Sequence, residues 1–359
     1  MRRVSATPPT RRRALGLTLL LPLALAPALA AADLVLPSGF TTEVYVTGDG
    51  FEEGQTRGAR GIPSTSTVVF DEDGTLYLAR TGRRYGGGET EDLWRIYRIP
   101  AGGARLTPQS ESRYLHGPPL RNSQVAAVRA GRELLVTAFD RERKVGLLYR
   151  MLDGRAELLA GGTPPPGRAP LLRQPEGVAA DTAGTLYVAD REDNAILRLG
   201  PTGQVLDPRY VGVSRPRLLV MDDRDRLWIG ADGEAQAPWQ RGPGEIWLVS
   251  PGSEPTRLLR GPVPSGMGLS PAGHLLVADR QNNQVFAITA EGRRVDLIGF
   301  TNGDGPRTLG FAPSTAATRR AGIAGDLFLI VIRRGTWPVN EVIRISGPFD
   351  ELIRQRAAP

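Results

Sequence analysis

Charged side chains recur at two matching positions in this chain, ten residues before and a few residues after a repeated leucine. The set consists of Glu176, Asp190, Asp279, Arg80, Arg217 and Arg333. Carboxylate oxygens are ligands for hard cations such as Ca²⁺, and guanidinium groups bind carboxylates through two parallel hydrogen bonds. Gathered around one opening, these residues could therefore hold a cation or orient the hydroxyls and carboxylate of a sugar acid.

Each of these charges also has an ordinary structural explanation. Asp190 and Asp279 each precede a turn, where an aspartate commonly accepts hydrogen bonds from backbone amides. Glu176 and Arg217 belong to neighbouring repeats and could form a salt bridge with each other. Ligand binding and structural roles both remain open at this stage.

Three long connections carry an aromatic residue together with arginines. They span residues 81–92 with Tyr85, residues 232–245 with Trp239, and residues 333–338 with Trp337. Aromatic rings can stack on a sugar, and arginines can bind an anion. We expect these loops to rise from the same face as the charged set and to form a ligand-binding mouth, the alternative being a rim of packed aromatic side chains.

A repeat in the sequence predicts the strands that position these residues. Six short apolar segments begin at a leucine that recurs every 41 to 58 residues, and each follows a turn and precedes another apolar segment; the leucines are Leu76, Leu134, Leu186, Leu227, Leu275 and Leu327. Units of this length containing four strands are typical of a β-propeller. We therefore predict an all-β, six-bladed β-propeller of four-stranded antiparallel blades.

The first strand of each blade is expected to begin at the ligand-binding mouth, and the second strand to return to it. Counting back ten residues from each leucine gives Ser66, Gln124, Glu176, Arg217 and Ser265, and in the sixth blade the region 317–320. Residues 36–46 read as an additional strand that supplies the outer strand of the last blade and closes the ring. The tail at 349–353 is expected to pair there or to lie on the rim.

The first 32 residues read as a cleaved signal peptide. Arg11, Arg12 and Arg13 precede an apolar run over residues 14–26, which is too short to span a bilayer, and a stretch of alanines follows. The paired arginines also resemble the twin-arginine export motif. We therefore expect export to the periplasm or the extracellular space, no stable membrane anchor after cleavage, and a single propeller domain over residues 33–359.

Charge and cysteine content exclude some classes of function. The formal net charge is +7, but five arginines lie before residue 33, where there is no acidic residue, so the remaining chain is nearly balanced. A nucleic-acid-binding domain needs a basic field on its folded surface, so we expect no nucleic-acid partner. The chain contains no cysteine, which excludes disulfides and thiolate catalysis.

Three resemblances to known families cover the chain from residue 36 onward. The segment from Pro175 to Asn194 resembles an NHL repeat, and so does the segment 264–288. The segments 36–40, 325–328, 334–337 and 342–345 resemble soluble pyrroloquinoline quinone sugar dehydrogenases of the sorbosone type, and the fifth repeat resembles the gluconolactonase and regucalcin family. All three resemblances imply a six-bladed propeller.

The resemblances also imply particular chemistry, and the sequence departs from it at named residues. The quinone dehydrogenases use a histidine base, whereas this chain has only His116 and His274, and their closing His-Gly-Ser-Trp motif is replaced by an arginine-led segment at 334–337. The lactonases hold a divalent ion. Asp279 matches their aspartate, but Ser265 stands where they have an asparagine. Glu176, which belongs to another blade, would have to take the place of their glutamate.

The function favoured by the sequence is binding of a small polar or anionic, sugar-like ligand, or of a protein partner, at the mouth of the channel. The alternative is a sugar-directed enzyme, either a quinone-dependent dehydrogenase or a calcium-dependent lactonase. Calcium and pyrroloquinoline quinone are both candidate cofactors, and neither has a complete set of family residues here.

Overall fold

Each repeated unit starts with two strands joined by a tight turn, which the third repeat illustrates. Gly184 has a φ of 83°, in the left-handed region that glycine adopts without strain, between strands β12 (Pro175–Ala180) and β13 (Leu186–Asp190). The Asp181 carboxylate stabilises the turn by accepting a hydrogen bond of 2.8 Å from the amide of Thr185. The computed structural model describes residues 34–51, 60–80, 93–237, 240–289, 291–332 and 340–357. Residues 1–33, which include the expected signal peptide, lie outside this range.

Six antiparallel sheets form the blades, and each uses four strands in chain order or nearly so. Blade one contains β3 (Val69–Phe70), β4 (Leu76–Leu78), β5 (Leu93–Ile99) and β7 (Leu115–Arg121); blade two contains β8 (Gln124–Arg129), β9 (Glu133–Asp140), β10 (Val145–Leu152) and β11 (Arg155–Gly161); blade three contains β12, β13, β14 (Ala195–Leu199) and β15 (Val205–Gly212). Blade four contains β16 (Pro216–Met221), β17 (Leu227–Ala231), β18 (Gly244–Val249) and β19 (Thr256–Gly261); blade five contains β20 (Pro264–Leu269), β21 (Leu275–Asp279), β22 (Gln284–Ile288) and β23 (Arg294–Phe300); blade six contains β24 (Gly305–Phe311), β25 (Leu327–Ile332) and β26 (Glu341–Ser346). The predicted six-bladed β-propeller is confirmed, and every predicted leucine lies in the second strand of its blade.

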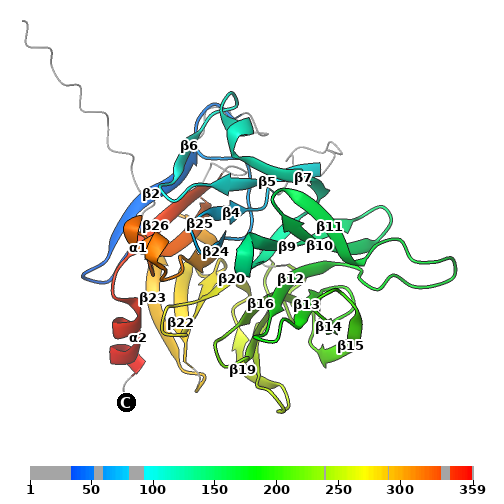
Figure 1. Cartoon of the computed structure of the whole chain (residues 1–359). Helices are drawn as coiled ribbons and strands as arrows, with labels where there is room; N and C mark the ends of the chain where they lie inside the picture. The colour runs from blue at the N-terminus through cyan, green and yellow to red at the C-terminus, as the bar shows by residue number, and fades with distance from the viewer. Residues whose placement is uncertain are drawn as a thin grey trace, which may run out of the picture. The chain divides into compact units, whose positions relative to one another are not determined.

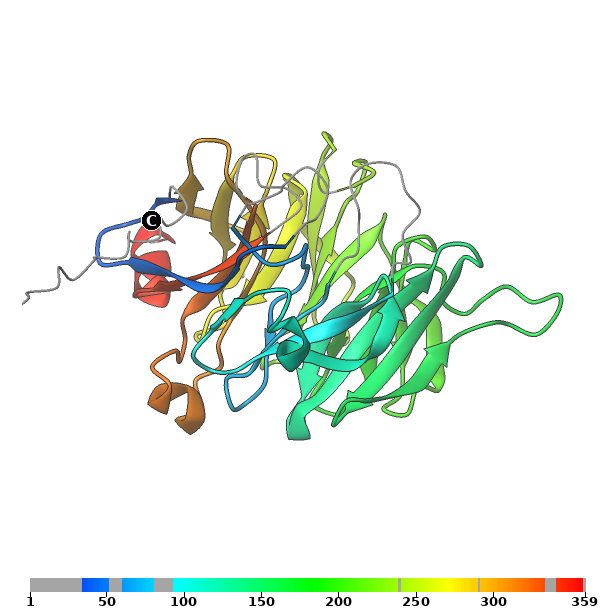
Figure 2. The same cartoon turned by 90° about the horizontal axis from the view of Figure 1, so that it is seen from above.

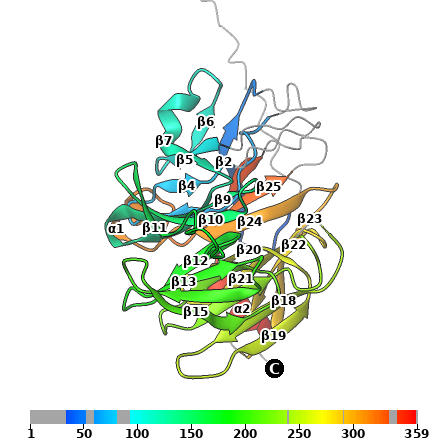
Figure 3. The ribbon, with the colours of Figure 1, turned by 90° about the vertical axis from the view of Figure 1, so that its right-hand side faces the viewer.

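The blades are arranged radially with their first strands at the centre (Figure 1), and Figure 3 gives the view from the right-hand side of Figure 1. Each first strand contacts the next around the ring, and β24 contacts β3 to complete the circle. Six clusters of buried apolar side chains lie between successive blades, one for each pair. Burial of this apolar surface is the main source of stability, because each blade shields the faces of its neighbours.

The N-terminal strand closes the ring as predicted. Strand β2 (Thr41–Gly48) pairs antiparallel with β26 and so supplies the fourth strand of blade six. Two further pairings were not predicted: β6 (Ala104–Leu106) adds in parallel to β2, and β1 (Leu34–Val35) pairs with β23 at the edge of blade five. The two ends of the described chain therefore meet in neighbouring blades.

Helical segments are few and short. They are η1 (Glu111–Tyr114), η2 (Ala130–Arg132), α1 (Ala316–Arg320) and α2 (Phe349–Ala357). The tail neither pairs as a strand nor lies loosely on the rim: α2 buries Phe349 and Ile353 in the apolar cluster shared by blades five and six. Helix α1 lies in the connection between the first and second strands of blade six, and Figure 2 shows it in orange, projecting from the strands. Within the described residues, no helix has the length and apolar character needed to cross a membrane.

Candidate functional site

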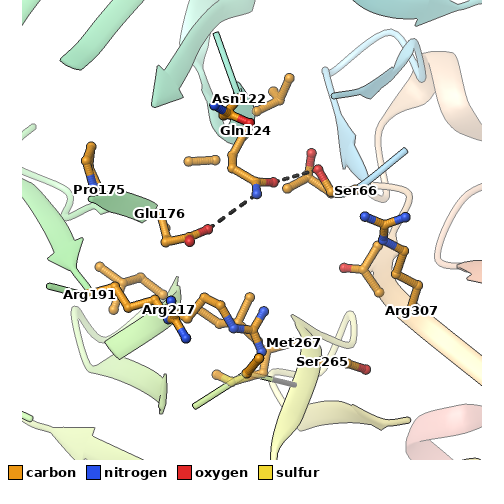
Figure 4. A pocket seen from close by; sticks show the side chains of 18 of the residues that line it. Ser66, Asn122, Gln124, Pro175, Glu176, Arg191, Arg217, Ser265, Met267 and Arg307 are labelled. Atoms are coloured by element: carbon orange, nitrogen blue, oxygen red, sulfur yellow. Dashed lines mark hydrogen bonds between the residues drawn. The ribbon is translucent and has the colours of Figure 1, made fainter. Parts of the chain in front are cut away.

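A cavity of roughly 790 Å³ lies at the centre of the ring. Every blade contributes to its wall, and one polar side chain comes from the start of each first strand (Figure 4). These six residues, named here the polar ring, are Ser66, Gln124, Glu176, Arg217, Ser265 and Arg307. Five of the six were predicted by their distance from the repeated leucine.

Blade six is where the prediction was wrong. The region 317–320 belongs to α1, which lies between the strands at the far end of the hairpin, and the residue that lines the cavity is Arg307. The insertion of α1 lengthens the connection, so a fixed count from Leu327 passes over the strand. A proline precedes the polar-ring residue in each of the last four blades, and Pro306 would have identified Arg307 from the sequence.

Irregular strand pairing directs these side chains into the cavity. In blade four, Pro216 pairs with Ala231 and Leu218 with Gly230, which leaves Arg217 as the extra residue of a β-bulge. Ser265 and Arg307 are the extra residues of equivalent bulges in blades five and six. A bulge re-aims a side chain without ending the sheet, which explains why the same position faces the cavity in successive blades.

Glu176 is surrounded by neutral hydrogen-bond donors. Its carboxylate accepts hydrogen bonds from Nε2 of Gln174 at 2.9 Å and Nε2 of Gln124 at 3.3 Å, and Gln124 in turn accepts one from the Ser66 hydroxyl at 2.6 Å. Burial within the ring raises the pKa of Glu176, although Arg217 and the Gln174 amide act in the opposite direction. Among the described residues, Glu176 has no ion pair.

The two arginines beside Glu176 are held by a different carboxylate. Nε of Arg217 lies 2.9 Å from Oδ1 of Asp232, and Nε of Arg191 lies 3.0 Å from Oδ2 of the same group, which is fully buried. The salt bridge that the sequence allowed between Glu176 and Arg217 is therefore replaced by one between Arg217 and Asp232. Asp232 fixes two guanidinium groups from neighbouring blades against the cavity wall.

Asp190 and Asp279 do not line the cavity, and the capping alternative describes their contacts. Asp190 accepts a hydrogen bond of 3.3 Å from the amide of Asp193 in the following turn. It also accepts shorter ones from the amides of Arg173 at 2.6 Å and Gln174 at 3.1 Å, which precede β12 and were not predicted, and burial raises its pKa. Asp279 accepts one from the amide of Asn282 at 3.1 Å. Both carboxylates are fully buried, so neither is available to a ligand in the cavity.

Arg80 also points elsewhere than the cavity. Its guanidinium pairs with Glu111 at 2.8 Å and lies over the ring of Trp94 at 3.6 Å. The other predicted site residues, Arg333, Tyr85, Trp239 and Trp337, lie outside the described residues. The flanking parts of the blade-four connection are described, however, and Gln236, Ala237 and Gln240 do line the cavity.

The residues that follow the capping aspartates are the ones that reach the cavity. An Asp-Arg pair closes the second strand in three blades, and the arginines of these pairs, Arg141, Arg191 and Arg280, line the cavity together with Arg217 and Arg307. The repeated Asp-Arg pair is a sequence signal that would have identified them. Glu176 is the only acidic side chain among the described lining residues.

The wall thus combines positive charge with apolar surface. Apolar residues such as Val125, Leu219, Met267 and Leu309 line the cavity next to the polar ring. Five guanidinium groups belong to the described wall, and two of them pair with the buried Asp232, so positive charge exceeds negative charge around the cavity. A small anion with hydroxyl groups and some apolar surface matches this environment.

The described residues do not match the metal or base sets of the related enzymes. Nowhere in the described ranges do three His, Asp or Glu side chains gather to hold a metal ion. His116 lies in β7, the outer strand of blade one, and His274 lies in the turn before β21, so neither lines the cavity. Among the described lining residues, Glu176 is thus the one carboxylate that could contact a cation, and no histidine is placed to act as a base.

Comparisons with known proteins agree with the architecture. The NHL repeat family model matches residues 172–199, and no curated protein is significantly similar to this chain. Among solved structures, a gluconolactonase from Xanthomonas campestris is similar with a TM-score of 0.53 and 15% identity, covering 82% of this chain and 92% of that one.

Two dehydrogenase structures share the fold to the same degree. The quinone-bound aldose sugar dehydrogenase from Streptomyces coelicolor has a TM-score of 0.51 and 14% identity, covering 87% of this chain and 100% of that chain. A glucose dehydrogenase also has a TM-score of 0.51 and 14% identity, covering 86% and 100% respectively. At such identities the likeness concerns the fold. The chain is therefore a six-bladed β-propeller with an NHL repeat in its third blade, and it shares its fold with gluconolactonases and quinone-dependent sugar dehydrogenases.

Proposed function

We propose that this protein is an exported propeller that binds a small hydroxylated anion, such as a sugar acid, in its central cavity. The observation that carries this proposal is the described lining of the cavity, where five arginines surround one glutamate. Guanidinium groups bind carboxylates through paired hydrogen bonds, and Ser66, Gln124 and Glu176 offer partners for hydroxyl groups. A cavity of roughly 790 Å³ suits a small molecule better than a protein partner.

The second candidate is a quinone-dependent sugar dehydrogenase. Pyrroloquinoline quinone carries three carboxylates, which would find partners in the arginines of the cavity wall. The quinone would supply two-electron oxidation, but the described lining residues include no histidine to accept the proton from a sugar. A calcium-dependent lactonase is supported less well, because the described part of the lining offers a single carboxylate.

Calorimetry with three sugar acids tests the proposed function. D-glucuronate, D-galacturonate and D-gluconate are compared with neutral D-glucose, and at least one acid is expected to bind while glucose does not. Calcium and pyrroloquinoline quinone are tested in parallel by thermal shift, where saturation at 100 times the dissociation constant would raise the free energy of unfolding by about 2.7 kcal/mol. Failure of all three acids, or turnover of a sugar with the quinone, would contradict a binding function.

The Arg217→Gln variant locates the site. Loss of a charge-assisted hydrogen bond is expected to weaken binding of the sugar acid by about 1 to 3 kcal/mol, or about 5- to 150-fold. Arg257→Gln is the matched control, because Arg257 pairs with Glu245 in the outer half of the same blade and does not line the cavity. Equal affinity in the two variants would place the ligand elsewhere.

A further inference from the structure

The hydrogen-bond partners of Glu176 differ in kind from those of the two arginines beside it. Arg217 and Arg191 satisfy their Nε groups with Asp232, and their Nη2 groups donate to the carbonyl oxygens of Pro264 and Gln236. Glu176 faces the cavity beside them, yet its carboxylate contacts only the amides of Gln174 and Gln124. The cavity therefore contains a carboxylate that can gain a proton without breaking an ion pair.

The neutral partners of Glu176 can adapt to that proton. A protonated carboxyl group needs one acceptor, and a glutamine side chain offers an amide oxygen as well as an amide nitrogen. The hydroxyl of Ser66, which now donates to Oε1 of Gln124, can accept a hydrogen bond instead when the amide turns over. In the free protein, the chain from Ser66 through Gln124 to Glu176, drawn in Figure 4, can thus serve either protonation state. When an anion is bound, the single carboxyl proton points to the ligand, and the amides of Gln124 and Gln174 continue to donate to the carboxyl oxygens.

The described charged groups that face Glu176 are arginines, apart from the buried carboxylate of Asp232. Arg217 extends from β16 and Arg191 from the turn after β13, with Asp232 behind both. Arg141, Arg280 and Arg307 line the rest of the cavity, and the described lining contains no histidine or lysine. An anion that binds to Arg217 and Arg191 would therefore bring a second negative charge close to Glu176 and draw on the same positive field.

We propose that Glu176 takes up one proton when an oxyanion binds at Arg217 and Arg191, and then donates a hydrogen bond to that anion. Asp232 already pairs with both arginines, so a bound carboxylate would draw on the positive charge that stabilises ionised Glu176 and would also repel it; both effects favour the protonated form of Glu176. In each of the two arginines, Nη1 has no hydrogen bond to a described residue and is available to the ligand. Glu176 is thus a specificity-determining residue, which selects ligands that can accept a hydrogen bond from its protonated carboxyl group. The inference rests on the proposed anion-binding function and names how that site recognises its ligand.

Proton uptake is measurable on the unaltered protein. The sugar acid that binds most tightly is titrated at pH 7 in two buffers with different ionisation enthalpies, and the heats are expected to differ by the equivalent of one proton taken up per ligand. Because the carboxyl group of the ligand is ionised throughout this range, the affinity should fall about tenfold for each unit of pH increase above the pKa of Glu176 in the free protein. Binding with equal heats in the two buffers would overturn the inference and leave the proposed function intact, whereas absence of binding would overturn both.

The Glu176→Gln variant separates a donor from an acceptor role. Glutamine reproduces the protonated carboxyl group, so the variant is expected to bind the sugar acid at least as tightly as the wild type at pH 8, with no proton uptake and no pH dependence. Glu157→Gln is the control, since Glu157 is exposed on β11 and pairs with Arg150; it should retain both effects. Weaker binding by Glu176→Gln would show that Glu176 accepts a hydrogen bond from the ligand, which contradicts the inference.

A second readout requires no ligand. Glu176 binds a proton more readily in the folded than in the unfolded chain, so this residue should cost the wild type stability as the pH rises. Urea unfolding of Glu176→Gln should therefore show a gain in stability over the wild type at pH 8 that shrinks toward pH 4. A constant difference across this range would show that burial does not raise the pKa of Glu176 in the free protein.

Discussion

In several hairpins of this propeller, one aspartate accepts hydrogen bonds from both backbone amides and side chains. Asp222 in blade four accepts hydrogen bonds from the amides of Arg224 and Arg226 at 3.0 and 2.9 Å, from Nε of Arg226 at 2.7 Å and from the indole of Trp228 at 3.2 Å. Asp71 and Asp181 occupy the same place in blades one and three, where a tyrosine hydroxyl replaces the indole. The turn and the buried aromatic residue of the second strand are therefore fixed by one carboxylate.

The first prediction concerns the charge of Asp222. Burial disfavours its ionised form, but the hydrogen bonds from Arg226, Trp228 and Arg224 outweigh burial and lower its pKa. A lowered pKa in the folded state gives stability that is present above the unfolded value and is lost as the pH falls through the folded value. Asp222→Asn should therefore destabilise the protein by about 1 to 3 kcal/mol at pH 7, and by less in acid, as measured by urea unfolding.

The neighbouring residue offers a close control for this prediction. Asp223→Asn removes an equal charge one position away on an exposed side chain, and its effect should stay within about 0.5 kcal/mol. Equal losses in the two variants would show that net charge, rather than the hydrogen bonds of Asp222, determines the effect.

At the scale of single residues, a site residue could be predicted from the sequence where its position repeats in each blade. It could not be predicted where it depends on contacts between blades. Glu176 and Arg217 were identified because the distance from the start of the first strand to the second strand is nearly constant. The pairing of Arg191 with Asp232 was missed, because it joins the ends of two blades whose relative placement is set by packing. Asp190 and Asp279 mark the correct turns, but alternation along the chain directs the following arginine, rather than the aspartate, into the cavity.

Among the elements, the first strands approach each other so closely that glycine is required between them. A Cβ atom at Gly266 in β20 would lie 2.4 Å from Cα of Thr308 in β24, and one at Gly177 in β12 would lie 2.8 Å from the carbonyl oxygen of Arg217. These contacts are with backbone atoms, which cannot move away independently. The glycines therefore set the distance between blades at the level of the polar ring.

The second prediction follows from this close approach. Gly266→Ala should destabilise the protein by about 1 to 3 kcal/mol, because the added methyl group has no space beside the neighbouring strand. Gly212→Ala, in the outer strand β15, is the control: no atom lies within 4 Å of its added Cβ, and alanine should be neutral or slightly stabilising there. Thermal unfolding of both variants provides the comparison, and similar melting temperatures would mean that the blades can separate without cost.

At the scale of the whole molecule, stability depends on joining strand β2, near the start of the described chain, to the sheet of blade six. Val46 in β2 is completely buried in the cluster shared by blades six and one, together with residues such as Leu78 and Phe328. The hydroxyl of Thr47 also donates to Glu341 at 2.6 Å, across 294 positions of the chain. Loss of this strand would expose one face of blade six along its length.

The third prediction tests that closure. Val46→Ala removes buried methyl groups and should lower the free energy of unfolding by about 1 to 3 kcal/mol. Val35→Ala in β1, a side chain that is 60% exposed, should change it by less than about 0.5 kcal/mol. A small effect at Val46, measured by urea unfolding, would indicate that the ring remains closed by its other contacts.

The closure of the ring could be predicted because the last repeat supplies only three strands, and the strand expected at residues 36–46 belongs to no other repeat. The helical tail could not, since Phe349 and Ile353 acquire their environment only from blades five and six together. The parallel addition of β6 to β2 was missed for the same reason: it joins segments of different blades, and neither carries a local signal for the pairing.

The bulges at the polar ring have a consequence for how propellers of this kind can diversify. Arg217, Ser265 and Arg307 occupy equivalent bulges in three successive blades, although one side chain is small and neutral and the others are long and cationic. Since an extra residue in a bulge lies outside the regular pairing of the strands, its side chain can be exchanged while the neighbouring hydrogen bonds are kept. Mutations that change ligand selectivity are thereby largely uncoupled from those that unfold the ring, so that new specificities can arise by single substitutions, in evolution or in directed libraries.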